Sequence, residues 1–242
     1  MAEMCQLHAS IVAGGGRAGR VYVRLIVTLL IVLGGVVLVP DAARAAPGVC
    51  PPACDVIPDS AWIDAGSVPL FGEYRWPGLA SAAVTAPAPR FEFESWCAGP
   101  DVTDDARDYA VAARAVVRHP DGQWNLLAQV MHWRGDTVTG GRTALQVLEL
   151  ARIALARCQL TAPDASPSIT TSTATDLVAV ISESGDRVMH TYLLADPASS
   201  TVVELTLWTT LPAQVDWRAE ADTVVLDAMA LPLCATYLGS CR

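Results

Sequence analysis

Cysteines are the residues of this chain whose number and spacing most directly predict chemistry. Six of the seven lie after residue 45, and an even number is typical of a disulfide framework in an exported protein. The sequence contains no C-x-x-C redox motif, and its cysteines and histidines lack the short spacing of zinc sites. We therefore expect three structural disulfides. The six candidates are Cys50, Cys54, Cys97, Cys158, Cys234 and Cys241.

The preferred pairing joins Cys97 to Cys158. Cys97 ends an extended aromatic stretch and Cys158 ends a predicted helix, so this bond would fix the helix to the sheet. In the chain-entropy treatment, closing a loop of about sixty residues is worth roughly 4 kcal/mol of stability.

The other pairings stay open. A bond between Cys50 and Cys54 has to fold back across two prolines, which favour extended geometry. Cys234 and Cys241 can pair locally because Gly239 can turn the chain. Equally, the two N-terminal cysteines can pair with the two C-terminal ones.

Histidine and serine provide no recognisable catalytic arrangement. Three single histidines in apolar strands could each act as a general base, but this pattern is more typical of structural residues. No G-x-S-x-G motif occurs, and Ser240, the nearest serine in a small-residue context, lies near the chain end between cysteines. We therefore predict no catalytic residue, no metal and no cofactor. The histidines are His119, His132 and His190.

A run of aspartates precedes the first predicted hairpin. Asp101, Asp104 and Asp105 could bind calcium or act as acid and base. A solvated acidic loop explains the same residues, and the sequence favours this interpretation.

Seven tryptophans are many for a chain of 242 residues. Trp96, Trp124, Trp133 and Trp208 lie in predicted strands, where a core position is expected. Any tryptophan that faces water instead could stack against a sugar or a peptide.

The first 45 residues have the pattern of a secretory signal peptide. The run from Leu25 to Val39 is uncharged and apolar, arginines precede it, and Ala43-Arg44-Ala45 follows as a small-x-small cleavage pattern. In a helix this run spans about 22 Å, less than the roughly 30 Å of a bilayer core. We expect cleavage after Ala45 and a secreted or envelope-associated protein. An uncleaved membrane anchor is the alternative.

The charge of the chain restricts its partners. It has 16 Lys+Arg, all of them arginine, against 25 Asp+Glu, and 52% of its residues are hydrophobic. Without residues 1–45 the balance is 12 arginines against 23 acids, a formal charge of −11. Such a chain repels nucleic acid and anionic lipid, and its hydrophobic content argues against intrinsic disorder. We expect no nucleic-acid partner, and a membrane contact only if the signal segment is retained.

Hydrophobic alternation and turn residues predict the order β-β-α-β-β-β-α after an irregular lead-in at 46–90. This order predicts a single α+β domain at 91–242, a twisted antiparallel sheet with helices packed on it and disulfide cross-links. The expected strands are Arg90–Trp96, Tyr109–Arg118, Gln123–Trp133, Asp176–Ser182, Arg187–Leu194 and Thr201–Thr210, with a further short one at Val68–Tyr74.

Two helices are expected, at Thr143–Arg157 and at Trp217–Ala230. Gly140-Gly141 is expected to break the chain before Thr143 forms a capping box, and Asp216 to cap the second helix. Pro232 is expected to end or kink that helix. The segment Leu160–Ser172, rich in Pro, Ser and Thr, is predicted as a loop.

These elements resemble a known family. The Trp96-Cys97 pair, the helix ending in Cys158, and a three-strand meander before a final helix are similar to the extracellular sensor domains of mycobacterial serine/threonine kinases of the PknH type and their secreted relatives. The lysine-free, Arg- and Ala-rich composition is that of a high-GC actinobacterium. The resemblance covers about Phe91 to Leu238 and implies a disulfide-linked antiparallel sheet with a ligand-binding cleft. Because the chain differs at Cys50, Cys54 and Cys241, no binding residue is carried over.

We therefore expect an exported, non-catalytic, sensor-like or binding domain of the cell envelope. Its ligand would be a small molecule, a glycan or an envelope protein held in a groove beside the sheet. A secreted hydrolase with an unrecognised active site is one alternative, which would require a histidine and an acid to converge in a pocket. A stand-alone protein-interaction module is another, which would require a large exposed apolar patch bearing tryptophan.

Overall fold

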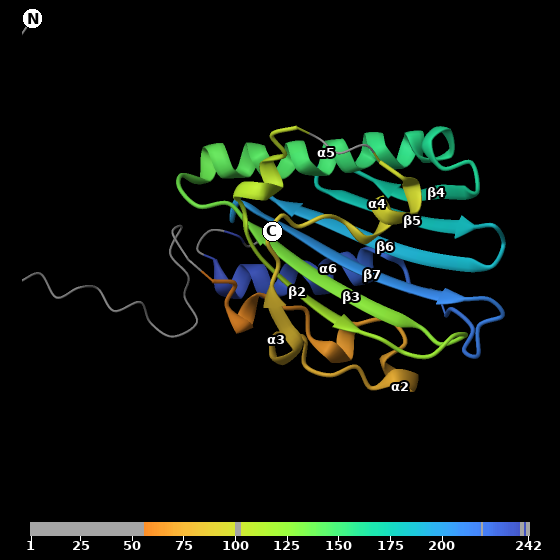
Figure 1. Cartoon of the computed structure of the whole chain (residues 1–242). Coiled ribbons are helices and arrows are strands. Elements are labelled where there is room, and N and C mark those ends of the chain that lie inside the picture. The colour runs from red at the N-terminus through yellow and green to blue at the C-terminus, as the bar shows by residue number, and fades with distance from the viewer. Residues whose placement is uncertain (1–55, 100–102, 219, 238–239, 241–242) are drawn as a thin grey trace, which may run out of the picture. The chain divides into compact units, whose positions relative to one another are not determined.

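Seven antiparallel strands form one sheet in the computed structural model of the protein (Figure 1). The structure describes residues 56–99, 103–218, 220–237 and 240, all within the compact unit Ala45–Arg242. The strand order is β1-β2-β3-β7-β6-β5-β4, which confirms the predicted α+β class with an antiparallel sheet. The strands are β1 (Ala83–Thr85), β2 (Val111–Val117), β3 (Asn125–His132), β4 (Ala165–Ser172), β5 (Asp176–Glu183), β6 (Arg187–Asp196) and β7 (Thr201–Thr210).

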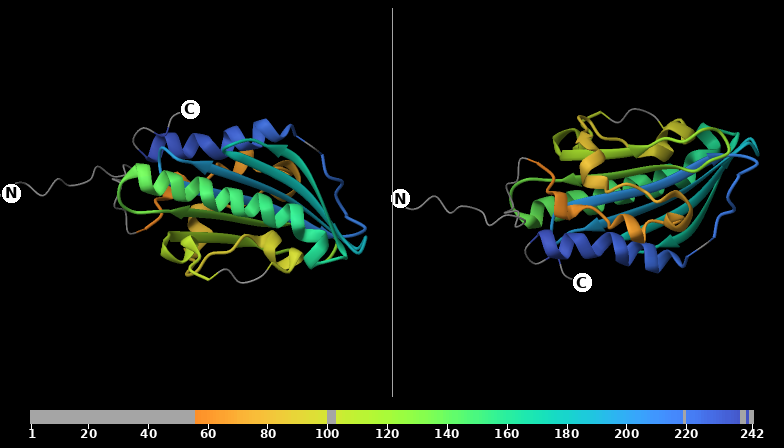
Figure 2. Two further views of the ribbon diagram at one scale, coloured as in Figure 1. Left: turned by 90° about the horizontal axis from the view of Figure 1, so that it is seen from above. Right: turned by 90° about the horizontal axis from the view of Figure 1, so that it is seen from below.

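Helices cover both faces of this sheet (Figure 2). The long helix α5 (Thr137–Thr161) lies along one face together with α4 (Glu92–Cys97). The other face packs against α6 (Asp222–Thr236) and the short helices α2 (Phe71–Tyr74) and α3 (Leu79–Ala82). Three 3₁₀ turns complete the described chain: η1 (Asp59–Ala61), η2 (Ala65–Ser67) and η3 (Ala106–Tyr109).

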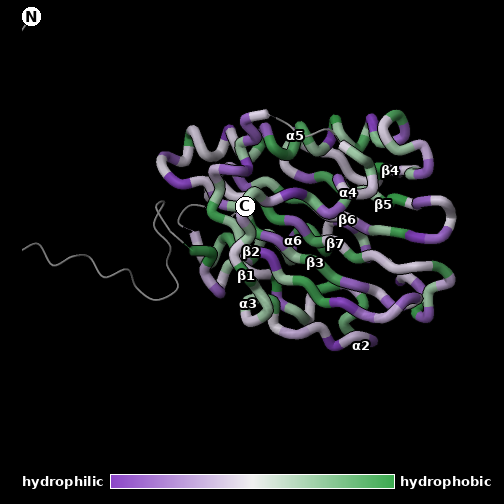
Figure 3. The backbone as a smooth tube through the Cα atoms, viewed as in Figure 1, coloured by the Kyte–Doolittle hydropathy of each residue, from purple (hydrophilic) through white to green (hydrophobic). Residues whose placement is uncertain are grey.

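Strand alternation divides the core into two hydrophobic clusters, one on each face of the sheet. In β7, Leu205 and Leu207 belong to the cluster under α6, whereas Val202 and Trp208 belong to the cluster under α5. Figure 3 shows hydrophobic residues along the central strands, which are covered on both faces. The four tryptophans predicted for the core are all buried: Trp96, Trp124, Trp133 and Trp208.

The predicted hairpin is present as β2 and β3, which pair from Val111 with His132 to Val117 with Leu126. Gly122 in the connecting turn has a positive φ of 78°, which favours glycine. Its N–H donates to Thr210 Oγ1 at 2.6 Å, so the hairpin turn is attached to the end of β7.

The start of α5 differs from the prediction. Asp136, not Thr143, caps the helix by accepting from Thr139 N at 2.8 Å, and the two glycines lie inside the helix rather than before it. A Cβ at Gly140 would lie 2.4 Å from Ser200 Oγ, and one at Gly141 would lie 2.4 Å from a backbone carbonyl. The glycines therefore permit close packing of the helix against the β6–β7 turn, a requirement that local sequence does not reveal.

The strand predicted at Arg90–Trp96 is wrong, because this segment contains α4. Phe93, Trp96 and Cys97 are all buried in the cluster under α5. Their three- and four-residue spacing is that of one helix face. The alternation of aromatic and acidic residues in Phe91–Ser95 imitated a strand over a segment shorter than two helical turns.

Two other segments were also assigned to the wrong class. The short strand predicted at Val68–Tyr74 is largely the helix α2. The loop predicted at Leu160–Ser172 contains β4, an edge strand whose residues are mostly polar and exposed. An edge strand tolerates Pro167 and needs little apolar surface, which is why its composition resembled a loop.

The last helix begins later and extends further than predicted. It starts at Asp222, and Ala221 occupies the capping position instead of Asp216. Pro232 lies inside the helix, which continues to Thr236. Met229 and Leu233 are both 1% exposed on either side of the proline, so burial of this face maintains the helical path.

A row of polar residues, two of them fully buried, crosses the centre of the sheet on the face that carries α5. Arg114, Gln129 and Glu204 are direct neighbours across β2, β3 and β7. Arg114 Nε donates to Gln129 Oε1 at 2.8 Å, and Gln129 Nε2 donates to Glu204 Oε2 at 3.3 Å. Glu204 is fully buried, and this burial raises its pKa to about 8.

The polar row holds the chain segment before α4 against the sheet. The backbone N–H of Glu92 donates to Glu204 Oε1 at 2.7 Å. The carbonyl of Arg90 accepts from Arg114 Nη2 at 2.5 Å and from Gln129 Nε2 at 3.3 Å. These bonds satisfy backbone groups that the strand ladder cannot reach, so the segment lies in one position over the core.

Glu204 gives the protein a predictable pH dependence. Its raised pKa means that the folded state holds a proton between about pH 4.5 and 8 that the unfolded state has lost. Stability should therefore be greatest below this range and fall as pH rises through it, with a contribution of up to about 1.4 kcal/mol per pH unit. Urea unfolding of the wild type and Glu204→Gln at several pH values measures this, and the variant should lose that part of the slope.

Glu149→Gln is the matched control, because Glu149 is exposed on α5. It should keep the wild-type slope. If Glu204→Gln and the wild type show the same pH profile, the carboxyl of Glu204 does not retain its proton in the folded state.

Candidate functional site

The described chain contains an open cavity of about 270 Å³ between α5 and the segment that runs from α4 to η3. Most of its wall is apolar, and its apolar residues come from the helix and from the start of α4. We call this cavity the helix pocket. Its apolar wall is formed by Phe91, Val147, Leu150, Ala151, Ile153 and Ala154.

Two apolar residues of α5 remain exposed at the helix pocket. Leu150 is 51% exposed and Ile153 is 38% exposed, although the neighbouring Val147 and Ala151 are buried. Large apolar side chains at a cavity mouth offer surface that a ligand can remove from water, at about 25 cal/mol per Å². The pocket therefore suits an apolar or partly apolar ligand.

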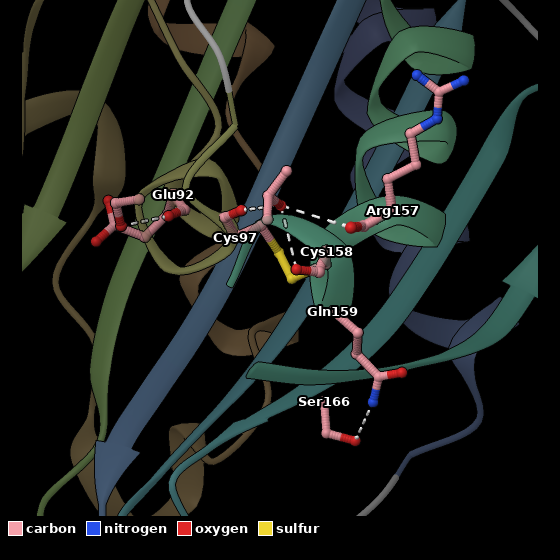
Figure 4. Close-up of a disulfide and its surroundings, with 8 residues drawn as sticks. Glu92, Cys97, Arg157, Cys158, Gln159 and Ser166 are labelled. Carbon is pink, nitrogen blue, oxygen red and sulfur yellow. Dashed lines mark hydrogen bonds between the residues drawn. A yellow bond between two sulfur atoms is a disulfide. The ribbon is translucent and has the colours of Figure 1, made fainter. Parts of the chain in front are cut away.

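A disulfide fixes the two walls of the helix pocket to each other. Cys97 at the end of α4 is bonded to Cys158 in α5, with an S–S distance of 2.01 Å and Cα atoms 4.7 Å apart (Figure 4). Thr161 Oγ1 also donates to the carbonyl of Cys97 at 2.5 Å. The predicted pairing is therefore confirmed, although Cys97 ends a helix and not a strand.

Of the other four cysteines predicted to form disulfides, the described residues include one, Cys234. Cys234 in α6 is disulfide-bonded. Cys50, Cys54 and Cys241 lie outside the described residues. The disulfide between Cys97 and Cys158 is consistent with an extracytoplasmic protein.

An ion-pair cluster forms the polar end of the helix pocket. Arg107 is 7% exposed and donates from Nη2 to Asp105 Oδ2 at 2.7 Å, while its Nη1 forms an ion pair with Glu94. Its guanidinium also lies 5.1 Å from the centre of the Phe91 ring. Asp105 and Glu94 both pair with the buried Arg107, so the charged groups of this cluster are paired with one another.

Ionisation of the cluster follows from these contacts. Burial of Asp105 opposes its charge, but the hydrogen bonds and charge of Arg107 outweigh burial and lower the pKa of the carboxyl. Burial likewise opposes the charge of Arg107, while Asp105 and Glu94 raise its pKa. Asp105 and Arg107 therefore stay charged at neutral pH and cannot exchange protons with a substrate there.

Arg157 is the second cation at the helix pocket, and it differs from Arg107 in its surroundings. It lines the pocket from an exposed position on α5, and the described residues form no ion pair with it. The pocket therefore has at its edge an arginine that no described residue pairs with.

The aspartate run matches the predicted solvated loop only in part, since Asp104 is exposed whereas Asp105 is buried. Asp105 is 3% exposed, caps η3 and pairs with Arg107, so it is not part of a solvated acidic loop. Asp104 has a positive φ of 57°, and Asp101 lies outside the described residues. Within the described parts of the chain there is no group of three or more His, Cys, Asp and Glu side chains suited to a metal ion.

The three histidines occupy separate aromatic environments. His119 lies beside Tyr74, with ring centres 5.2 Å apart. His132 stacks on Tyr237, and His190 stacks on Trp217. None of the three lines the helix pocket, and Ser240 Oγ bonds to Asp196 rather than to a histidine.

Sequence analysis missed the residues that make the helix pocket. The helix predicted at Thr143–Arg157 contains Leu150 and Ile153, but neither residue was assigned a role. Two large apolar residues outside the core stripe of a helix are a usable signal, because nothing in the helix itself buries them. Arg107 has no such signal, since its two acidic partners converge only after folding.

The predicted signal peptide lies outside the described residues. Within the described residues, no helix combines the length and apolar character needed to cross a bilayer. Comparison of the chain with known protein families and with curated protein sequences finds no match.

Removal of the Cys97–Cys158 bond should destabilise the protein. The bond closes a loop with a sequence separation of 61, which corresponds to roughly 4 kcal/mol of unfolding free energy. Urea unfolding of the double variant Cys97→Ala/Cys158→Ala measures this loss. Peptide mapping under non-reducing conditions is the control for the pairing itself, and a peptide that links either cysteine to another partner would contradict the assignment.

Proposed function

We propose that the protein is an extracytoplasmic, non-catalytic binding domain that takes an amphipathic small molecule in the helix pocket. The observation that carries this proposal is an apolar cavity with an arginine at its edge, Arg157, that forms no ion pair with a described residue. An apolar chain would cover Leu150 and Ile153, and an acidic headgroup would pair with Arg157.

Charge supports an acidic rather than a basic headgroup. The exported part of the chain is strongly acidic, so a positively charged ligand would find many competing sites on its surface. The acidic surface repels an anionic ligand elsewhere, whereas Arg157 at this pocket can attract it because no described residue pairs with this arginine. Glu94 and Asp105 are not open anionic sites, because Arg107 pairs with both of them and Arg90 Nε lies 3.7 Å from Asp105 Oδ2.

Binding is a better account of the pocket than catalysis. The buried ionisable groups of the pocket form ion pairs with each other, and the residues that line it include neither a histidine nor a cysteine thiol. The likeness to sensor domains of the PknH type, the signal peptide with cleavage after Ala45, and an actinobacterial origin belong to the same proposal. An envelope sensor or carrier needs a pocket that releases its ligand unchanged, and this pocket meets that need.

Filling the helix pocket should prevent binding. Ala154 is half-buried in its wall, so Ala154→Trp places a large ring in the cavity without replacing a core residue. Titration with decanoate, followed by isothermal calorimetry, should show binding to the wild type and at least about tenfold weaker binding to the variant. Ala156→Trp is the matched control, because Ala156 is exposed on the same helix and does not line the pocket. Equal affinity of both variants would refute the proposed site.

The headgroup contact can be tested separately. Arg157→Gln should weaken binding of decanoate but leave binding of decanol unchanged, because only the carboxylate loses a charged partner. Arg142→Gln, near the other end of α5, should alter neither affinity. If Arg157→Gln weakens both ligands equally, the arginine contributes packing and not charge recognition.

A further inference from the structure

A second cavity lies on the opposite face of the sheet, at the end where the β2–β3 and β5–β6 turns are found. It is an open groove of about 620 Å³ between the start of β6 and the segment from residue 211 to 217. Its size is within the range of small-molecule sites. We call it the aromatic groove, and it is lined by Trp124, Val188, His190, Leu211, Asp216 and Trp217, among others.

The rings of the aromatic groove form a stacked platform. Trp217 and His190 are almost parallel, with ring centres 3.7 Å apart and an angle of 11° between their planes. Trp124 lies behind them, 4.9 Å from Trp217 and tilted by 49°. Trp124 Nε1 donates to the carbonyl of Val215 at 2.8 Å, which fixes the ring under the segment that carries Trp217.

The segment that carries Trp217 is attached at two points. Leu211 N–H donates to the carbonyl of Asp186 at 2.6 Å, and Gln214 N–H donates to the carbonyl of Gly122 at 2.7 Å. Both acceptors lie in turns between strands. The groove wall is therefore held by the sheet, and little conformational entropy has to be lost when a ligand binds.

The polar groups beside the rings have no partners in the described chain. Neither ring nitrogen of His190 forms a hydrogen bond with a described residue, and neither does the exposed carboxylate of Asp216. Burial lowers the pKa of His190 to about 4, against the opposing charge of Asp222, so the imidazole is neutral at pH 7. A neutral ring nitrogen and a carboxylate are suited to bind hydroxyl groups.

Charge and ring geometry exclude two other classes of ligand. The segment from residue 211 to 222 carries three acids and one arginine, which disfavours phosphates and carboxylates. A quaternary ammonium group needs ring faces arranged around one point. Here Trp217 and His190 cover one face of each other, so the groove offers a platform and not a cage.

We propose that the aromatic groove binds a neutral sugar ring. The apolar C–H face of the sugar would lie on the ring platform, and its hydroxyl groups would donate to Asp216 and exchange hydrogen bonds with His190. This site is independent of the helix pocket, because Val188 and His190 lie on the α6 face of the sheet whereas the helix pocket lies under α5.

Saturation-transfer NMR tests the sugar site directly, because it detects ring protons of a ligand in contact with the protein. The probes are uncharged hexasaccharides of glucose, mannose, galactose and N-acetylglucosamine. We expect at least one to bind, with transfer strongest at its C–H protons, and Trp217→Ala to weaken it by about tenfold or more. Trp217→Phe should retain part of the affinity because it keeps a ring.

Two controls separate this site from other effects. Tyr109→Ala removes an exposed aromatic residue elsewhere, and Ala154→Trp blocks the helix pocket, so both should bind the sugar like the wild type. Circular dichroism of each variant establishes that it is folded. The proposal is overturned if none of the four sugars binds, if binding survives in Trp217→Ala, or if choline binds at Trp217 while the sugars do not.

Discussion

The structure depends on the attachment of the part of the chain at residues 90–99 and 103–107, which lies outside the strands, to the face of the sheet under α5. The polar row of Arg114, Gln129 and Glu204 supplies the buried hydrogen bonds for its first residues. The Cys97–Cys158 bond fixes its middle to α5, and Arg107 with its acidic partners holds its end. Without these attachments α5 would have no facing wall, and the helix pocket would not exist.

Sequence patterns predicted those parts of the fold that depend on local order. The β2–β3 hairpin, the meander of β5, β6 and β7, and the middle of α5 follow from alternation, turns and helical spacing. The errors have non-local causes. Gly140 and Gly141 serve a contact with the β6–β7 turn, β4 is ordered by its pairing with β5, and α4 is helical because of the cluster that buries it.

The candidate sites were less predictable than the fold. The pairing of Cys97 with Cys158 could be predicted because this bond would fix the predicted helix to the sheet. Trp217 could not be placed, because the helix predicted to include it starts five residues later. Its stacking on His190 depends on a strand that is distant in sequence, and pairing of this kind is set by sheet register rather than by local composition.

Some polar groups of this protein have hydrogen-bond or ion-pair partners and support the fold, whereas others have no such partner in the described chain and lie at the cavities. Asp105 and Arg107 are buried ions that pair with each other, and an unpaired charge there would cost several kcal/mol. Glu204 is buried and hydrogen-bonded, and burial raises its pKa to about 8. Arg157, Asp216 and His190 have no such hydrogen-bond or ion-pair partners in the described chain, and each lies at a cavity. Arg157 and Asp216 are exposed and stay solvated, so leaving them without a partner costs little, whereas a buried charge needs a partner. For this reason the groups without partners at the two cavities, including His190, whose pKa burial lowers to about 4, mark the places where we propose that the protein binds other molecules.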